Sequence, residues 1–158
     1  MGRYANKTAV SPSRSVEEID RILRRYKATQ FATGWDEEHG RGLVSFKVNS
    51  ISYKLEIPIP QKDELKIGPR NRRRTQLQID GVWEQIYRQR WRAMALVIKA
   101  KLEAVECGIS TFEQEFMTNI MLPGGQTVRD FLAPQLEYAI EHGTLPKGSP
   151  MLEGPKIK

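Results

Sequence analysis

Seven arginines lie close together in the middle of the chain, in the stretches "RNRRR" and "RQRWR". A guanidinium group stays charged at physiological pH and can donate two parallel hydrogen bonds to one phosphate. This residue type at this density therefore indicates binding to a polyanion such as nucleic acid. The set consists of Arg70, Arg72, Arg73, Arg74, Arg88, Arg90 and Arg92.

The distribution of charge along the chain points the same way. Residues 70–101 carry nine basic side chains, Lys99 and Lys101 among them, and two acidic ones, although the whole chain has a net charge of only +6. The rest of the chain holds sixteen basic and seventeen acidic side chains, so the whole excess lies in this segment. A solvated loop followed by a solvated helix face would have the same composition, and charge alone leaves both interpretations open.

Aromatic residues are interleaved with the basic ones, as in proteins that stack the bases of single strands. Trp91 lies between Arg90 and Arg92, and Tyr87, Tyr53 and Trp35 are the other candidates. Two roles are open for Trp91, which falls away from the main apolar stripe of its predicted helix. It can stack on a base, or it can pack under arginine stems or against a second helix.

The residue types that carry catalysis are sparse. There is no Walker loop and no GxGxxG motif. "DEEH" at 36–39 offers metal-binding side chains on a hairpin turn, but consecutive turn residues rarely converge on one ion, so we expect no catalytic residue and no metal or other cofactor. Cys107 has no adjacent base to activate it, and we expect it to be packed. Glutamates near a helix junction are expected to serve capping and solubility; they are Glu103, Glu106, Glu113 and Glu115.

Length and composition bound the class of protein. A chain of 158 residues predicts one domain with a substantial core. It has no run of 18 apolar residues, its first residues do not read as a signal peptide, and a lone cysteine gives no disulfide framework. These features predict a cytoplasmic protein with no membrane partner.

The elements that would position the basic residues can be predicted from periodicity. Residues 16–27 show helical spacing after a capping box of Ser15 and Glu18. Three antiparallel strands follow in "ATQFATGW", "GLVSFKV" and "ISYKLEIPIP", with Asn49 and Ser50 in a hairpin turn. The polar face of this sheet offers Lys47 and Lys54 to a ligand.

A long helix is expected over about residues 82–107, after a basic loop at 61–79. Because this helix is longer than three strands can cover, we expect part of it to pack elsewhere, for example on another subunit, and we expect a homodimer or higher homo-oligomer. Two shorter helices follow. The prediction is an α+β fold with a flexible arm at 1–14, one domain at 15–143 and a Pro/Gly-rich tail at 144–158.

Three stretches carry a resemblance that covers most of the chain. "RQRWRAMALVIKAKLEAVECGISTFEQEFMTNIMLPGGQTV" at 88–128, "RYKATQFATGW" at 25–35 and "IPIP" at 57–60 resemble a family of small uncharacterised proteins encoded by tailed phages and prophages. The resemblance implies a bacterial host cytoplasm and involvement in phage DNA metabolism. It implies no particular activity.

Two functional hypotheses follow. The first is sequence-independent binding of nucleic acid, DNA and preferably single-stranded, because no helix-turn-helix or zinc finger is visible. Arg70, Arg72, Arg73 and Arg74 would contact phosphates, Arg88 and Arg92 would line the groove, and Lys47 and Lys54 would lie on the sheet. The second is a protein–protein interaction module that binds a host or phage protein and has no nucleic-acid role.

Overall fold

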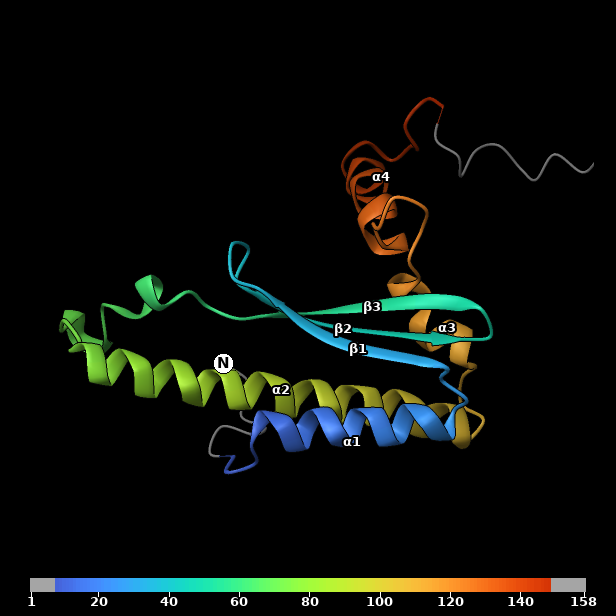
Figure 1. Cartoon of the computed structure of the whole chain (residues 1–158). Helices are drawn as coiled ribbons and strands as arrows, with labels where there is room; N and C mark the ends of the chain where they lie inside the picture. Colours follow the sequence, from blue (N-terminus) through green and yellow to red (C-terminus); the bar gives the residue numbers. More distant parts are fainter. Residues whose placement is uncertain (1–7, 149–158) are drawn as a thin grey trace, which may run out of the picture.

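The computed structural model describes residues 8–148 and has the predicted α+β fold (Figure 1). A first helix leads into a three-stranded antiparallel sheet of order β1-β2-β3, and a long helix and shorter helices follow. The elements are α1 (Pro12–Arg25), β1 (Gln30–Asp36), β2 (Arg41–Val48), β3 (Ile51–Pro58), the 3-10 helices η1 (Lys62–Leu65) and η2 (Pro69–Asn71), α2 (Gln76–Glu106), α3 (Phe112–Phe116), the 3-10 helix η3 (Met117–Asn119) and α4 (Val128–His142).

Helix α1 begins earlier than the sequence pattern indicates. Its N-cap is Ser11, whose hydroxyl accepts a hydrogen bond from the Arg14 N–H, and Pro12 occupies the first helical position. The predicted capping box at Ser15 is therefore wrong, because Ser15 is a fully buried residue within the helix. The domain boundary moves with it, since residues 12–14 are helical and not part of an arm. Of the rest of the predicted arm, residues 8–11 are described and lie before the helix, and residues 1–7 lie outside the described residues.

The sheet is a meander whose register follows the alternation in the sequence. Asn49 and Ser50 form the tight turn between β2 and β3, both with the positive φ that a twisted two-residue hairpin requires. Buried and less buried residues alternate along β2 and β3. The inner face therefore presents a continuous apolar surface to the helices.

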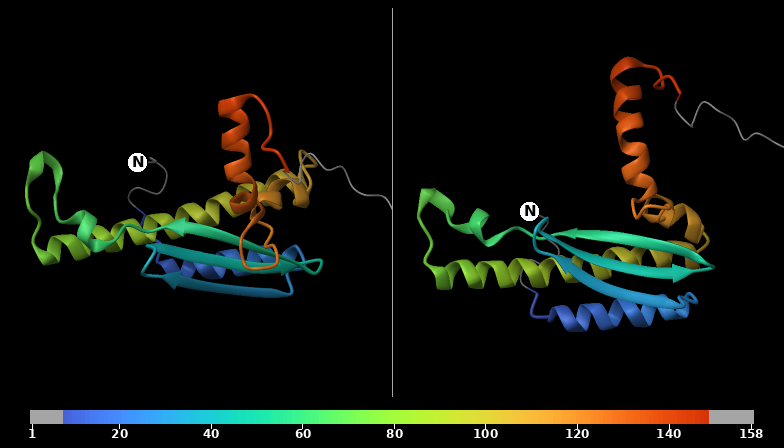
Figure 2. Two further views of the ribbon diagram at one scale, coloured as in Figure 1. Left: turned by 90° about the horizontal axis from the view of Figure 1, so that it is seen from above. Right: turned by 45° about the horizontal axis from the view of Figure 1, so that its top comes forward.

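Helices α1 and α2 lie side by side under that inner face and run in the same direction (Figures 1 and 2). The Tyr26 hydroxyl, just past the end of α1, donates to the Leu102 carbonyl of α2 at 3.0 Å, which fixes their relative position. The core between the helices and the sheet includes Val44, Phe46 and Tyr53 from the strands. Burial of this apolar surface supplies most of the driving force for the fold.

Helix α2 is longer than predicted and begins at Gln76, after a capping box formed by Thr75 and Gln78. Its 31 residues span about 46 Å. The N-terminal part of α2 extends past the sheet. The segment that follows β3 runs alongside this part of the helix (Figure 1). Part of the surplus helix thus packs against η1 of the same chain, where we expected another subunit.

Of the C-terminal elements, α3 packs on the core through Phe116, and α4 turns away from the body (Figure 2). Thr111, not Ser110, caps α3 and pairs with Gln114. After η3 the chain passes the outer edge of β3, where the Met121 N–H donates to the Ser52 carbonyl at 2.8 Å. Helix α4 then projects from this edge (Figure 2) and has no buried residue. Of the predicted tail, residues 144–148 are described and residues 149–158 are not.

Within residues 8–148, no helix is long and apolar enough to cross a membrane.

Candidate nucleic-acid interface

Four of the candidate arginines belong to one compact turn, residues 66–74, which we name the arginine turn. The Gly68 N–H donates to the Arg72 carbonyl at 2.8 Å, and the Arg74 N–H donates to the Lys66 carbonyl at 2.9 Å. The chain reverses at Arg70 and Asn71, which both have a left-handed backbone with φ near 59° and 58°. The predicted loop is thus an ordered, hairpin-like projection just before α2 (Figure 1).

The four arginines of the turn divide into two roles. The Arg74 guanidinium donates to the Leu65 carbonyl at 2.8 Å and to the Ile67 carbonyl at 3.2 Å, so it holds the turn together from inside. The side chains of Arg70, Arg72 and Arg73 are exposed, and across residues 8–148 none of them meets a carboxylate. Three exposed guanidinium groups without a carboxylate partner therefore belong to this turn, with Arg70 at its reversal and Arg72 and Arg73 on the returning limb. Arg74 is a supporting residue.

The arginines of α2 are mostly engaged by carboxylates. Arg88 pairs with Glu84 one turn earlier in the helix, and Arg92 pairs with Glu18 of α1. Arg90 is exposed and lies beside a shallow hollow next to the β1–β2 turn. The predicted groove wall of Arg88 and Arg92 is therefore better described as the ion-paired flank of two packed helices.

Trp91 cannot act as the stacking platform that the sequence suggested. It is 3% exposed and lies in the core. Its ring packs on Gly42 of β2, where a Cβ would come within 3.4 Å of the indole Cζ2. The apolar stripe of α2 turns to include Trp91, because the sheet covers this side of the helix, and Val97 from the predicted stripe is exposed instead.

The remaining basic candidates lie far from the arginine turn. Lys99 is exposed, but it follows Gln76 by 23 residues, which corresponds to about 35 Å along the helix axis. Lys47 and Lys54 lie on the outer face of the sheet, opposite to α2. Lys54 is also committed locally, since its ammonium donates to the Gly125 carbonyl at 3.0 Å and lies 3.4 Å from Glu56.

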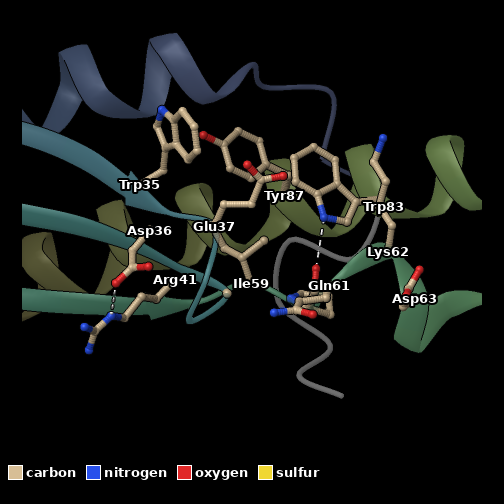
Figure 3. A pocket seen from close by; sticks show the side chains of 12 residues that line it. Trp35, Asp36, Glu37, Arg41, Ile59, Gln61, Lys62, Asp63, Trp83 and Tyr87 are labelled. Atoms are coloured by element: carbon tan, nitrogen blue, oxygen red, sulfur yellow. Dashed lines mark hydrogen bonds and ion pairs between the residues drawn. The ribbon is translucent and has the colours of Figure 1, made fainter.

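An aromatic cleft lies beside the arginine turn and was not predicted as a unit. It is an open hollow of about 650 Å³ between the β1–β2 turn, η1 and α2. Trp35 of β1 and the pair of Trp83 and Tyr87 of α2 stand in one row along it (Figure 3). Lys62 and Asp63 of η1, the element that precedes the arginine turn in the sequence, also line it. Tyr87 and Trp35 were among the aromatic candidates of the sequence, whereas Trp83 was not, and no feature of the sequence indicates that these rings meet in one cleft beyond the end of the sheet.

Charged groups around the cleft are partly neutralised by one another. The Asp36 carboxylate accepts hydrogen bonds from the His39 ring at 2.9 Å, from the His39 backbone N–H at 3.1 Å and from Arg41 Nε at 3.0 Å. The bond from the His39 side chain is the main cause that lowers the pKa of Asp36 to about 2, and the other two add to it. The "DEEH" turn is thus organised by internal hydrogen bonds, and residues 8–148 contain no group of three His, Cys, Asp or Glu side chains placed to hold a metal ion.

The helix junction at Cys107 serves structure. Glu115 accepts hydrogen bonds from the Ser110 hydroxyl at 2.7 Å and from Lys101 at 3.2 Å, and these two donors lower its pKa. Glu106 accepts from the Tyr26 hydroxyl at 3.1 Å. Cys107 itself is exposed, so the expectation that it is packed is wrong.

Comparisons with protein-family models, with curated proteins and with solved structures find no match to this chain. The resemblance to a phage and prophage family stays a prediction. The arginine turn and the aromatic cleft are therefore the features from which we infer a function.

Proposed function

We propose that this protein binds single-stranded nucleic acid without sequence preference, with DNA as the preferred form. One observation carries the proposal: three exposed guanidinium groups belong to one ordered turn and face no carboxylate in the described part of the chain. Such a cluster attracts phosphates and releases counterions when it binds them. Arg70, Arg72 and Arg73 are the proposed phosphate contacts.

The neighbouring surfaces favour a single strand over a duplex. Aromatic side chains at the surface offer their faces to unpaired bases, and a duplex keeps its bases stacked away from them. Helix α4, which stands clear of the body, carries Asp130, Glu137 and Glu141 against one arginine, so phosphates would repel it from a major groove. Binding of a single strand through its phosphates at the arginine turn agrees with the exposed aromatic side chains and with the acidic residues of α4.

Fluorescence anisotropy with labelled single-stranded and duplex DNA of equal length, from about 50 to 200 mM salt, tests the proposal. The wild type is expected to bind the single strand more tightly, with a steep loss of affinity as salt rises. Replacing Arg72 and Arg73 together by Ala should weaken binding to all sequences and lower the salt slope by about one to two units.

A matched control keeps the change in net charge the same. Arg21 and Arg25 are exposed arginines of α1, far in sequence from the arginine turn, and their double replacement by Ala removes the same two charges. This control should leave the salt slope nearly unchanged. Weak binding of the wild type at the lowest salt, or equal effects of the two double variants, would overturn the proposal.

A second candidate function is a protein–protein interaction through α4. The helix has no buried residue, and Phe131, Leu136, Tyr138 and Ile140 are exposed on it. A surface of this kind is typical of a contact with another protein. If the anisotropy experiment shows no affinity for nucleic acid, this is the function that the surface favours.

We further propose that the protein acts in the cytoplasm of a bacterial host and as a homodimer. The lone cysteine supports a reducing compartment. The exposed apolar residues of α4 support a second copy as the contact.

A further inference from the structure

The exposure of the Trp35 indole is unusual for so large an apolar side chain. The residue is 71% exposed, although its direction on β1 is the same as that of partly buried Phe31. Its cross-strand neighbour is Gly42, so no side chain on β2 covers the ring. Within the described residues no aromatic ring or cation is paired with Trp35. Most of its surface is therefore available to a ligand.

The other two rings of the cleft form a fixed wall. Trp83 and Tyr87 stack with centroids 5.0 Å apart and an angle of 11° between their planes. The Trp83 indole donates to the Pro60 carbonyl at 2.9 Å, and the Lys62 ammonium lies 5.4 Å from the Trp83 ring centroid. Tyr87 in turn meets Trp91 edge-on at 6.2 Å. These contacts use the faces of both rings and leave Trp35 as the open platform (Figure 3).

We propose that the aromatic cleft receives one nucleobase, which stacks on Trp35 and lies against the Trp83–Tyr87 wall. The hollow has the size of a small-molecule site and combines apolar walls with a few polar groups. Stacking on aromatic side chains is the usual way in which proteins hold unpaired bases. The inference rests on the proposed function, because a strand bound at the arginine turn would bring its bases past η1 into the cleft.

The proposed guest is a base and not an organic cation, the other guest that aromatic rings attract. The Lys62 ammonium already lies over the Trp83 ring. Charged groups of both signs line the cleft: Arg41, Lys62, Asp36, Glu37 and Asp63. A cation on the Trp83 face would have to displace Lys62, whereas a neutral base on Trp35 would not.

The test compares Trp35→Ala with Tyr138→Ala in anisotropy titrations of the full chain. Tyr138 is an exposed aromatic of α4 outside the cleft, so its loss is the matched control. Trp35→Ala should lower the affinity for single-stranded DNA by roughly 5- to 100-fold, with the salt slope unchanged. Tyr138→Ala should change it less than about twofold, and Trp35→Phe should restore most of the loss.

Two further arms separate this inference from the proposed function. If Arg72→Ala with Arg73→Ala weakens binding and Trp35→Ala does not, the cleft holds no base, although the protein still binds strands. If the wild type binds no strand, free dCMP and dTMP are titrated into the protein to test whether the cleft binds a nucleotide. Tryptophan fluorescence is the readout. Saturable quenching that is lost in Trp35→Ala supports a nucleotide site, and absence of quenching overturns it.

Discussion

The indole of Trp91 lies in the core under the sheet, and its N–H reaches no acceptor in the part of the chain that the structure describes. A buried donor without a partner costs about 1–3 kcal/mol, while the buried ring surface contributes more than that in the opposite direction. Trp91 is therefore a net stabilising residue with one unfavourable atom. Two substitutions of Trp91 can therefore measure the contribution of the ring and the cost of the N–H separately.

We expect Trp91→Ala to lower the free energy of unfolding by about 3–5 kcal/mol, because it leaves a large cavity. Trp91→Phe should cost less than about 2 kcal/mol, since it keeps an aromatic ring and removes the unpartnered N–H. Denaturant titration of both variants measures this. A stable Trp91→Ala protein with weakened DNA binding would restore the stacking role that the sequence suggested.

Asp36 gives a second prediction at the scale of one residue, through pH. Its pKa in the folded protein, about 2, lies below that of an aspartate in an unfolded chain. Its contribution to stability is therefore complete above about pH 4 and is lost as the pH falls towards 2. The difference in unfolding free energy between the wild type and Asp36→Asn should shrink over that range. A difference that stays constant from pH 5 to pH 2 would show that the carboxylate does not organise the turn.

Residue type alone could identify the arginine cluster but could not assign roles within it. Arg74 and Arg73 are adjacent and chemically identical, yet one is bonded to two carbonyls of its own turn and the other is exposed. The difference arises from the reversal of the chain at Arg70 and Asn71, which no periodicity announces. The pairing of Arg92 with Glu18 could not be predicted from the sequence either, because the two residues are 74 positions apart.

Among the elements, α4 is the one whose stability is least explained by its own chain. Its N-terminus is well capped, with the Thr127 N–H and hydroxyl both donating to Asp130 at 2.8 Å. However, an isolated helix of 15 residues is marginal in water, and Pro134 removes one of its internal hydrogen bonds. Capping alone does not replace a packed face.

Hydrogen exchange should reveal this directly. Backbone amides of α4 are expected to exchange at least about 100-fold faster than those of α2 between Trp91 and Leu102, which lie against the core. Equal protection of both helices would mean that α4 is covered in solution. Light scattering at the same concentration would then show whether a second copy provides the cover.

At the scale of the whole molecule, most of the architecture could be predicted from the sequence. Alternation in β2 and β3 and the turn at Asn49 and Ser50 specify the meander locally, so the fold class and strand order follow from short-range patterns. The aromatic cleft could not be predicted in this way. It depends on how far α2 extends past the sheet and on where η1 returns, and both are decided by tertiary packing.

The two edges of the sheet differ, and this asymmetry limits how chains can associate. Met121 occupies part of the outer edge of β3 through its bond to Ser52, whereas within residues 8–148 no strand pairs with the outer edge of β1. Open edges are where separate chains add strands to one another. Two copies joined through β1 would form one continuous sheet whose outer edges are the partly occupied β3 strands, so this route favours a pair of chains over a fibre.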